Sequence, residues 1–223
     1  MATSGTSTWN LPIDEIIEEA LDHVGGEHVS GDEAKSARRS LNLLFRDMEN
    51  RGYPLAQLRE VSVTMVSGQR EYTLDTNVMA VMDFVIEKDD TEVPLNRMSL
   101  FDYNKIADKD HTGKPTNFTS NRQRDAITMK VWPLPDNSTD VVKGWVVKRI
   151  EDVSRSNQDV DLNVRFLPAI VAGLAYFMSF KRQGIDGNYR QELKMHYEEL
   201  IDRALLEDKE RTNLKAVPRL NLQ

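Results

Sequence analysis

Histidine and cysteine are the residues best suited to metal chemistry, and neither forms a recognisable site in this sequence. The chain has four histidines and no cysteine. The lack of cysteine excludes disulfides, thiolate zinc sites, iron–sulfur clusters and cysteine nucleophiles. His23 and His28 flank a glycine pair, where loop-end histidines on a charged surface are commoner than a metal site, and His111 and His196 stand apart. We therefore expect no metal and no cofactor.

Carboxylates are abundant, but their spacing does not suit acid–base catalysis. Glycosidase chemistry needs two carboxyl groups that face each other across a cleft. Adjacent residues on a helix point about 100° apart and cannot do this. The adjacent pairs are Glu18-Glu19, Asp89-Asp90 and Glu198-Glu199. Phosphate-binding glycine loops and the G-x-S-x-G elbow are missing from the sequence. A Ser-His-Asp triad needs only proximity in space, but no residue is singled out for one, so we expect a protein that is not an enzyme.

The charge balance argues against tight binding of nucleic acid. The 223 residues include 36 acidic and 29 basic side chains, for a net charge of −7. An acidic surface repels phosphate unless a local basic patch exists, and the basic residues are spread along the chain. No apolar run approaches the roughly 20 residues of a membrane span. Residues 1–8 lack the basic and apolar regions of a signal peptide, so we expect a flexible arm.

Helical spacing of apolar residues occurs at both ends of the chain. Residues 13–24 and 34–48 each form one apolar stripe, and the short loop between them predicts a helical hairpin. A strongly apolar helix begins near Phe166 with Pro168 in its first turn. A longer polar helix covers about residues 188–210.

The middle of the chain has the period of two that is typical of strands. Alternation predicts strands at residues 61–65 and 127–131, and a near-continuous apolar stretch at residues 79–87 predicts a central strand. A turn at residues 67–69 lets residues 71–74 return as a partner strand. A short helix is expected after Ser99.

The two strand tryptophans are expected to be core residues. Trp132 ends an alternating stretch, and Trp145 shares a face with Val147 in residues 141–149. This placement favours packing over a platform for base stacking.

The order of helices, strands and helices predicts an α+β fold. We expect a flexible N-terminal arm (residues 1–11), a single domain (residues 12–212) and an extended C-terminal tail (residues 213–223). In the domain, a helical bundle of the N-terminal hairpin and two C-terminal helices occupies residues 12–58 and 164–212. An antiparallel β-module is inserted at residues 59–150.

Several short segments occur in an order and spacing that cover roughly residues 12–210. They include G-x-x-x-Y-x-L from Gly68 to Leu74 and W-P-x-P-D from Trp132 to Asp136. The other segments are residues 14–25, 37–55, 102–115 and 166–176. Together they resemble the head-to-tail adaptor proteins of short-tailed bacteriophages, the family that includes tail tubular protein A. Ala56 stands where a tryptophan is typical of that family.

The resemblance implies a structural role in the virion. Such adaptors form a ring, usually of twelve copies, that docks beneath the portal protein and receives the tail nozzle protein or tail fibres. The genome DNA passes through the lumen without specific binding, and an acidic subunit suits that passage because like charge weakens phosphate contact.

Candidate contact residues lie mainly near the two ends of the chain. The tail is expected to bind the portal, and Trp9, beside the flexible arm, is a candidate for inter-subunit or nozzle contact. Tyr53 and Tyr103 are further candidates of the second kind. The portal-contact candidates are Leu214, Val217, Pro218, Leu220 and Leu222.

Two other functions stay open at this point. One is a nucleic-acid-binding module that uses Arg38, Arg39 and Arg46 of the N-terminal hairpin, although Glu33, Asp47 and Glu49 share the same helix. A steep loss of DNA binding with salt would support it. The other is a carboxylate-dependent cell-wall hydrolase, for which the sequence nominates no carboxylate pair.

Overall fold

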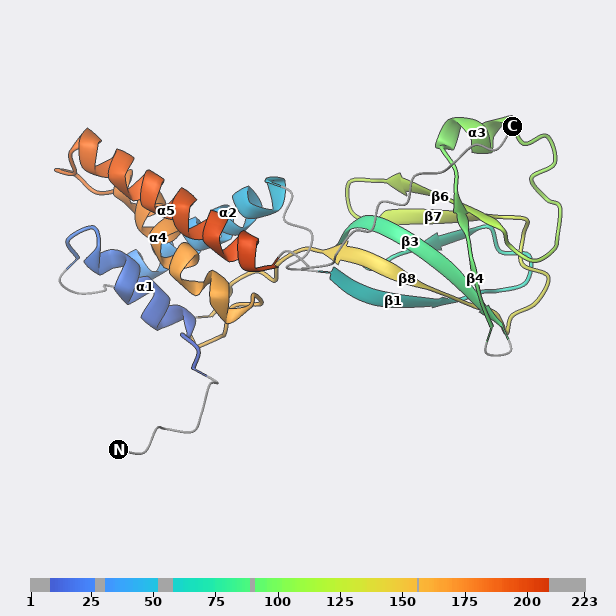
Figure 1. The fold of residues 1–223 in the computed structure, drawn as a ribbon, viewed down its shortest axis with the longest axis horizontal. Coiled ribbons are helices and arrows are strands. Elements are labelled where there is room, and N and C mark those ends of the chain that lie inside the picture. The colour runs from blue at the N-terminus through green and yellow to red at the C-terminus, as the bar shows by residue number, and fades with distance from the viewer. Residues whose placement is uncertain (1–8, 27–30, 52–57, 89–90, 156, 209–223) are drawn as a thin grey trace, which may run out of the picture. The chain divides into compact units, whose positions relative to one another are not determined.

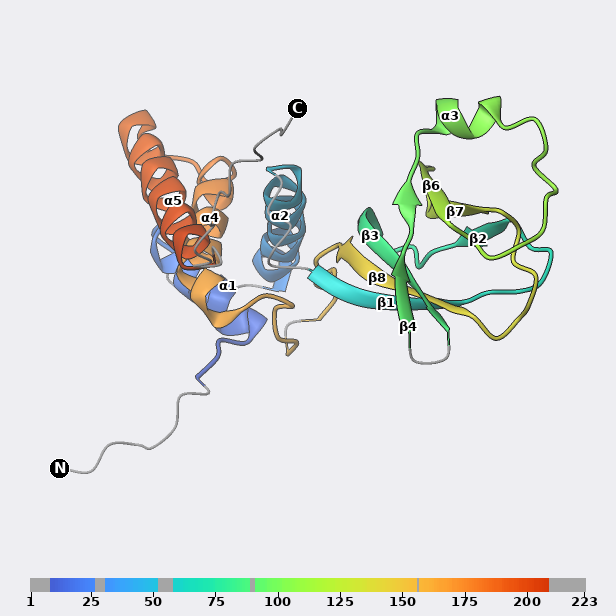
Figure 2. The same cartoon turned by 45° about the vertical axis from the view of Figure 1, so that its right-hand side comes forward.

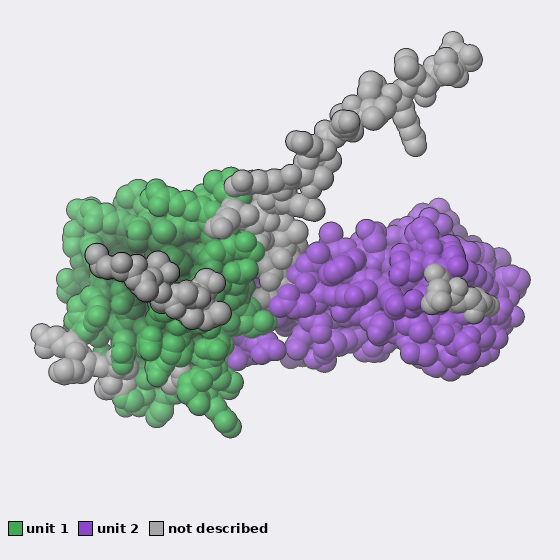
Figure 3. All heavy atoms as spheres, turned by 60° about the horizontal axis from the view of Figure 1, so that its bottom comes forward, with its two compact units in different colours: residues 1–47, 153–223 green, residues 48–152 purple. Residues whose placement is uncertain are grey.

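The computed structural model describes residues 9–26, 31–51, 58–88, 91–155 and 157–208. The chain divides into two compact units, coloured separately in Figure 3. A helical unit takes residues 1–47 and 153–223, and a β unit takes residues 48–152. The β unit is therefore inserted in the sequence of the helical unit. Within the described ranges, no helix combines the length and apolar character needed to cross a membrane.

The helical unit is organised around one apolar helix (Figures 1 and 2). Its elements are α1 (Ile13–Asp22), α2 (Gly31–Asn50, whose last three residues belong to the β unit), a 3₁₀ turn η2 (Val164–Phe166), α4 (Leu167–Ser179) and α5 (Gly187–Asp208). Both α1 and α5 pack closely against α4. Because α4 is apolar on nearly all sides, it can be covered by several helices at once.

Gly173 is a point of close helix packing in this bundle. A Cβ atom at this position would lie 2.9 Å from Leu44 Cδ1 of α2 and 2.9 Å from Tyr197 Cε2 of α5. Leu44 and Tyr197 are both buried. The missing side chain therefore lets α2 and α5 approach the middle of α4.

The β unit consists of two four-stranded sheets. The first has the order β1 (Leu58–Thr64), β8 (Val141–Lys148), β3 (Val78–Lys88) and β4 (Thr91–Pro94), and all its pairs are antiparallel. The second has the order β2 (Glu71–Thr73), β7 (Ile127–Trp132), β6 (Asn117–Arg122) and β5 (Asn96–Arg97). In this sheet β5 and β6 run parallel. A short helix, α3 (Leu100–Lys105), connects these two strands and is capped by Ser99, whose Oγ accepts from the backbone of Asp102 at 3.0 Å.

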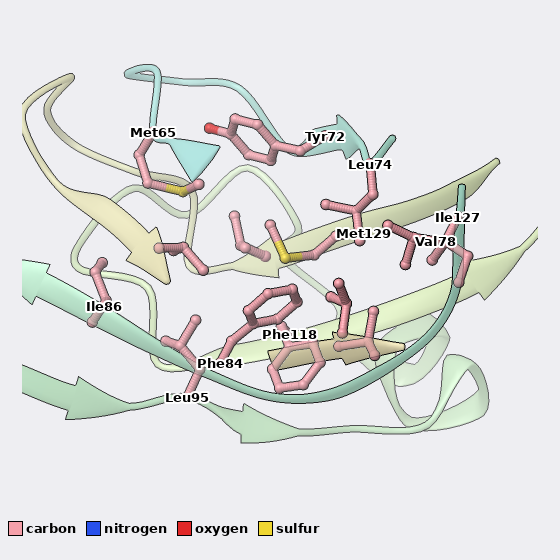
Figure 4. Packing of buried hydrophobic residues seen from close by; sticks show 14 residues of the cluster. Met65, Tyr72, Leu74, Val78, Phe84, Ile86, Leu95, Phe118, Ile127 and Met129 are labelled. Carbon is pink, nitrogen blue, oxygen red and sulfur yellow. The ribbon is translucent and has the colours of Figure 1, made fainter. Parts of the chain in front are cut away.

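Apolar side chains from both sheets form the core of the β unit (Figure 4). Phe84 of β3 and Phe118 of β6 meet edge to face with ring centroids 5.1 Å apart. Met65 and Met129 in the same cluster are fully buried. Such edge-to-face pairs stabilise a core beyond the area that they bury.

The predicted α+β class is confirmed, but one strand pairing is wrong. Residues 71–74 do not return beside residues 61–65, because β1 pairs with β8 and β2 pairs with β7. The predicted turn exists, with Gly68 at φ +75°. It carries the chain from one sheet to the other, so that Tyr72 reaches the core between them. Alternation shows that a strand is half-buried but does not identify its partner.

The prediction that Trp145 lies in the core is also wrong. Trp145 is 50% exposed, whereas Val142 and Val146 of the same strand are fully buried. Strand β8 is apolar on both faces, so the pattern alone could not decide which face turns inward. Trp132 is half-buried, and its Nε1 donates to the carbonyl oxygen of Asp108 at 3.1 Å.

Candidate assembly site

The predicted contact residues fall into three groups. Tyr53 and the tail residues Leu214, Val217, Pro218, Leu220 and Leu222 lie outside the described residues. Tyr103 in α3 is only 4% exposed, and this burial argues against a contact with another subunit. Trp9, in contrast, is 64% exposed and lies beside a groove of the helical unit.

The groove crosses three helices and has a volume of about 460 Å³. Its walls are mostly apolar. Leu167, Pro168, Val171 and Ala172 come from α4, and Leu200 comes from α5. Its other lining residues are Trp9, Leu11, Glu19, His23 and His196. Open apolar grooves with a few polar groups are typical binding sites.

Local contacts hold the elements that shape this groove. The backbone N–H of Ile13 donates to Gln158 O at 3.0 Å, which fixes the start of α1 and the direction from which residues 9–11 enter. At the other end of α1, the Tyr189 hydroxyl donates to His23 O at 2.7 Å. Pro168 stands in the first turn of α4, where its missing N–H is harmless.

The exposed face of α1 beside the groove is strongly acidic. The helix contains no lysine or arginine, and among the described residues none of its carboxylates forms an ion pair with a cation. The carboxylates are Asp14, Glu15, Glu18, Glu19 and Asp22, all exposed. Such a face favours a basic partner.

A basic surface with an exposed aromatic side chain lies where α4 ends. Phe180 is 60% exposed and packs edge to face on Tyr176, with ring centroids 5.1 Å apart. The Arg190 guanidinium lies 5.6 Å from the Phe180 ring centroid. Lys181 Nζ donates to the carbonyl oxygen of Ser36 at 2.9 Å, and Arg39 is three residues further along α2. Burial and, second, the charge of Arg39 lower the pKa of Lys181.

We call Phe180, Lys181, Arg39 and Arg190 the Phe180 knob. In the part of the chain that the structure describes, none of its three cations is paired with a carboxylate. The neighbouring Arg182 differs, because its guanidinium bonds to Glu33 Oε1 at 3.0 Å. The knob is therefore an aromatic side chain among unneutralised positive charges.

A second exposed aromatic side chain lies on the β unit. Trp145 projects from β8, an interior strand of the first sheet. On the same strand, Lys143 forms an ion pair of 2.5 Å with Glu87 of β3, and this bond raises the pKa of Lys143. This face is thus apolar at Trp145, and the positive charge of Lys143 is neutralised by Glu87.

The described residues provide no grouping of three or more histidine, aspartate or glutamate side chains that could hold a metal ion. His23 and His196 do line one groove together with Glu19, a proximity that their separation in sequence concealed. His111 packs near Trp132 with ring centroids 6.3 Å apart, and His28 lies outside the described residues.

Two of the three arginines proposed for nucleic-acid binding already have interaction partners within the chain. Arg38 donates to Ser154 O at 3.2 Å, and Arg46 also has an interaction partner. Arg39 alone of the three contributes to the knob.

A comparison with known protein families decides the class of protein. The model of the family described as SU10 adaptor protein matches residues 4–219. The chain belongs to this family. A search of curated proteins gave no significant match. The match confirms the resemblance to phage head-to-tail adaptors. An SU10 adaptor is a structural component of the virion, and this membership points to portal and tail components as its partners.

Proposed function

We propose that this SU10 adaptor forms a ring of about twelve copies between the portal and the tail nozzle, with the genome DNA passing through its lumen. The family match over residues 4–219 carries the proposal. The copy number and the lumen follow the resemblance of the sequence to adaptors of short-tailed phages.

The surfaces of the helical unit support assembly of copies in a ring. A closed ring needs a heterologous contact, in which two different surfaces of one subunit meet two neighbours. The unit offers an apolar groove with an acidic flank and a basic aromatic knob, which are made of different residues. Of the two described inter-subunit candidates, Trp9 at the groove is far more accessible than Tyr103.

The net charge of −7 suits a lumen through which DNA slides. Phosphates are repelled by acidic surfaces, so that passage leaves few strong contacts to break. This reasoning also predicts that the isolated chain binds DNA weakly and loses that binding in moderate salt.

The C-terminal tail is proposed to bind the portal. Residues 213–223 carry Leu214, Val217, Leu220 and Leu222 around Pro218, a composition suited to an extended segment in an apolar groove of a partner. Tyr53 is proposed for contact with a neighbour or the nozzle. During assembly in the host cytoplasm, the free chain is proposed to be monomeric, with the ring forming on docking.

Mass measurement by light scattering tests this function. The purified chain is measured alone and after mixing with a portal ring. We expect a monomer that joins the portal in many copies, and a chain truncated after Thr212 that does not join it. A full-length chain that fails to join its portal would overturn the adaptor proposal, whereas normal docking by the truncated chain would overturn only the role of the tail.

A further inference from the structure

We propose that the Phe180 knob of one copy docks into the apolar groove beside Trp9 of the next copy and that this contact joins neighbouring subunits. The inference rests on the proposed ring and assigns the two surfaces that build it. Both surfaces belong to the helical unit, so the contact requires nothing from the β unit.

The apolar parts of the two surfaces are complementary. Phe180 is 60% exposed at the end of α4, and Tyr176 supports its ring from behind. The groove is lined mainly by aliphatic side chains of α4 and α5, with the exposed indole of Trp9 at one side. Cavities of several hundred cubic ångströms hold drug-sized ligands, so about 460 Å³ accommodates a phenyl ring. Aromatic side chains that enter such pockets commonly dominate interface energies.

The charges of the two surfaces are complementary as well. Lys181 follows Phe180 in the sequence, Arg190 lies against the Phe180 ring, and Arg39 is close enough to Lys181 to lower its pKa. These three cations have no carboxylate partner in the described chain. Glu19 lines the groove, and the rest of the acidic α1 face adjoins it without cationic partners. A single docking event therefore neutralises both groups and sets the orientation of the incoming copy.

The knob and the groove share no residue, so the contact is heterologous. After one contact has formed, the pair of copies still presents one free knob and one free groove, and association continues until the ring closes. A two-fold contact would instead bring the same surface of both copies together and stop at a dimer.

The cysteine-free sequence allows a direct test by site-specific cross-linking. One variant carries Lys181→Cys and the other Glu19→Cys, both at exposed positions. The free chain is proposed to be monomeric, so the disulfide traps a transient contact between free copies. Under mild oxidation at high protein concentration, an equimolar mixture should form disulfide-linked dimers at least about tenfold faster than either variant alone. Arg124→Cys, whose side chain is 96% exposed on the β unit, replaces each partner in turn as the control. A mixture that cross-links no faster than this control would overturn the proposal, as would equally fast cross-linking of one variant with itself.

A second variant tests the knob itself. Phe180→Asp should reduce the cross-linking of the mixture at least about tenfold. Leu206→Asp, at a 62% exposed position on α5, should leave it unchanged. Circular dichroism of both variants confirms that each is folded, and full cross-linking with Phe180→Asp would contradict the assignment.

The cross-linking and portal-binding experiments test the interface and the adaptor function independently. If the wild-type chain joins the portal in many copies but the mixture does not cross-link, the adaptor function stands and the interface is wrong. If the mixture cross-links but no portal recruits the chain, the interface stands and the adaptor function is wrong.

Discussion

Gly144 of β8 faces Phe84 of β3 so closely that a Cβ atom at position 144 would overlap the Phe84 ring and the carbonyl oxygen of Asp83. This close approach lies next to an irregularity in β3, where the register against β8 shifts between Val81 and Phe84. Gly144→Ala should therefore lower the free energy of unfolding by at least about 1–3 kcal/mol, the usual cost of overpacking, because a backbone atom cannot move aside easily. Urea unfolding measures the change as a lower midpoint.

Gly113→Ala is the matched control for this substitution. A Cβ atom there would lie 3.7 Å from Pro133 Cβ, which is an ordinary contact. Its unfolding midpoint should stay close to that of the wild type. Equal effects of the two substitutions would show that the close approach at Gly144 is not the cause.

Asn42 on α2 binds the chain where it re-enters the helical unit. Its Nδ2 donates to Val153 O at 3.1 Å, and its Oδ1 accepts from Val153 N at 2.9 Å. Asn42→Ala should lower the free energy of unfolding by about 1–3 kcal/mol, because two partly buried backbone groups lose their partner. Asn42→Asp keeps the oxygen that accepts from Val153 N, so its thermal unfolding midpoint should lie between those of the wild type and Asn42→Ala. An alanine variant as stable as the wild type would show that water replaces the amide fully.

Tyr72 should make the β unit sensitive to high pH. Burial raises the pKa of its phenol above the ordinary value, and the hydrogen bond from Val66 N at 3.0 Å opposes this less strongly. A raised folded-state pKa means that this contribution to stability is complete below the unfolded-state pKa of about 10 and is lost as the pH rises through that value toward the folded-state pKa.

Tyr72→Phe should therefore be less stable than the wild type at pH 7, by about 0.5–1.5 kcal/mol for the lost hydrogen bonds. The difference should shrink as the pH rises beyond about 10. Urea unfolding of both proteins from pH 7 to 11 checks this, and a constant difference would rule out titration of Tyr72 as its source.

The close packing around Gly173 limits the size of the side chain that position 173 can hold. Gly173→Val should lower the free energy of unfolding by about 1–3 kcal/mol or more, because its branches meet Leu44 and Tyr197. Gly173→Ala should cost less, since the gain in helix propensity of about 1 kcal/mol offsets part of the strain. Thermal unfolding ranks the two, and a valine variant more stable than the alanine variant would contradict the packing described here.

Periodicity predicted the elements better than their partners. The helical stripes led to α1, α2, α4 and α5, and alternation led to β1 and β7, because these signals are local. The strand β6 was missed, because Asn117–Arg122 is largely polar and depends on pairing with β7. The pairing of β2 and the outward position of Trp145 depend on residues far away in the sequence.

Parts of the candidate site were visible in the sequence and parts were not. The lack of lysine and arginine in residues 13–22 and the position of Trp9 beside the expected flexible arm could be read directly from the sequence. The groove could not, because Glu19, Val171 and His196 come from three separate helices. Phe180 could have been noticed as an aromatic residue followed by Lys181 and Arg182 at the end of an apolar helix.

The insertion of the β unit also determines the order of events on the ribosome. Residues 48–152 are complete before α4 is synthesised, and both sheets of the β unit lie entirely within them. The Glu49 carboxylate already accepts from Ile150 N at 2.8 Å, so the two ends of the inserted unit are tied together early. The apolar faces of α1 and α2, in contrast, wait for α4 to emerge. The β unit can therefore fold before the helical unit is complete, and the groove and the knob that we assign to assembly both require residues of α5, which are synthesised after the β unit.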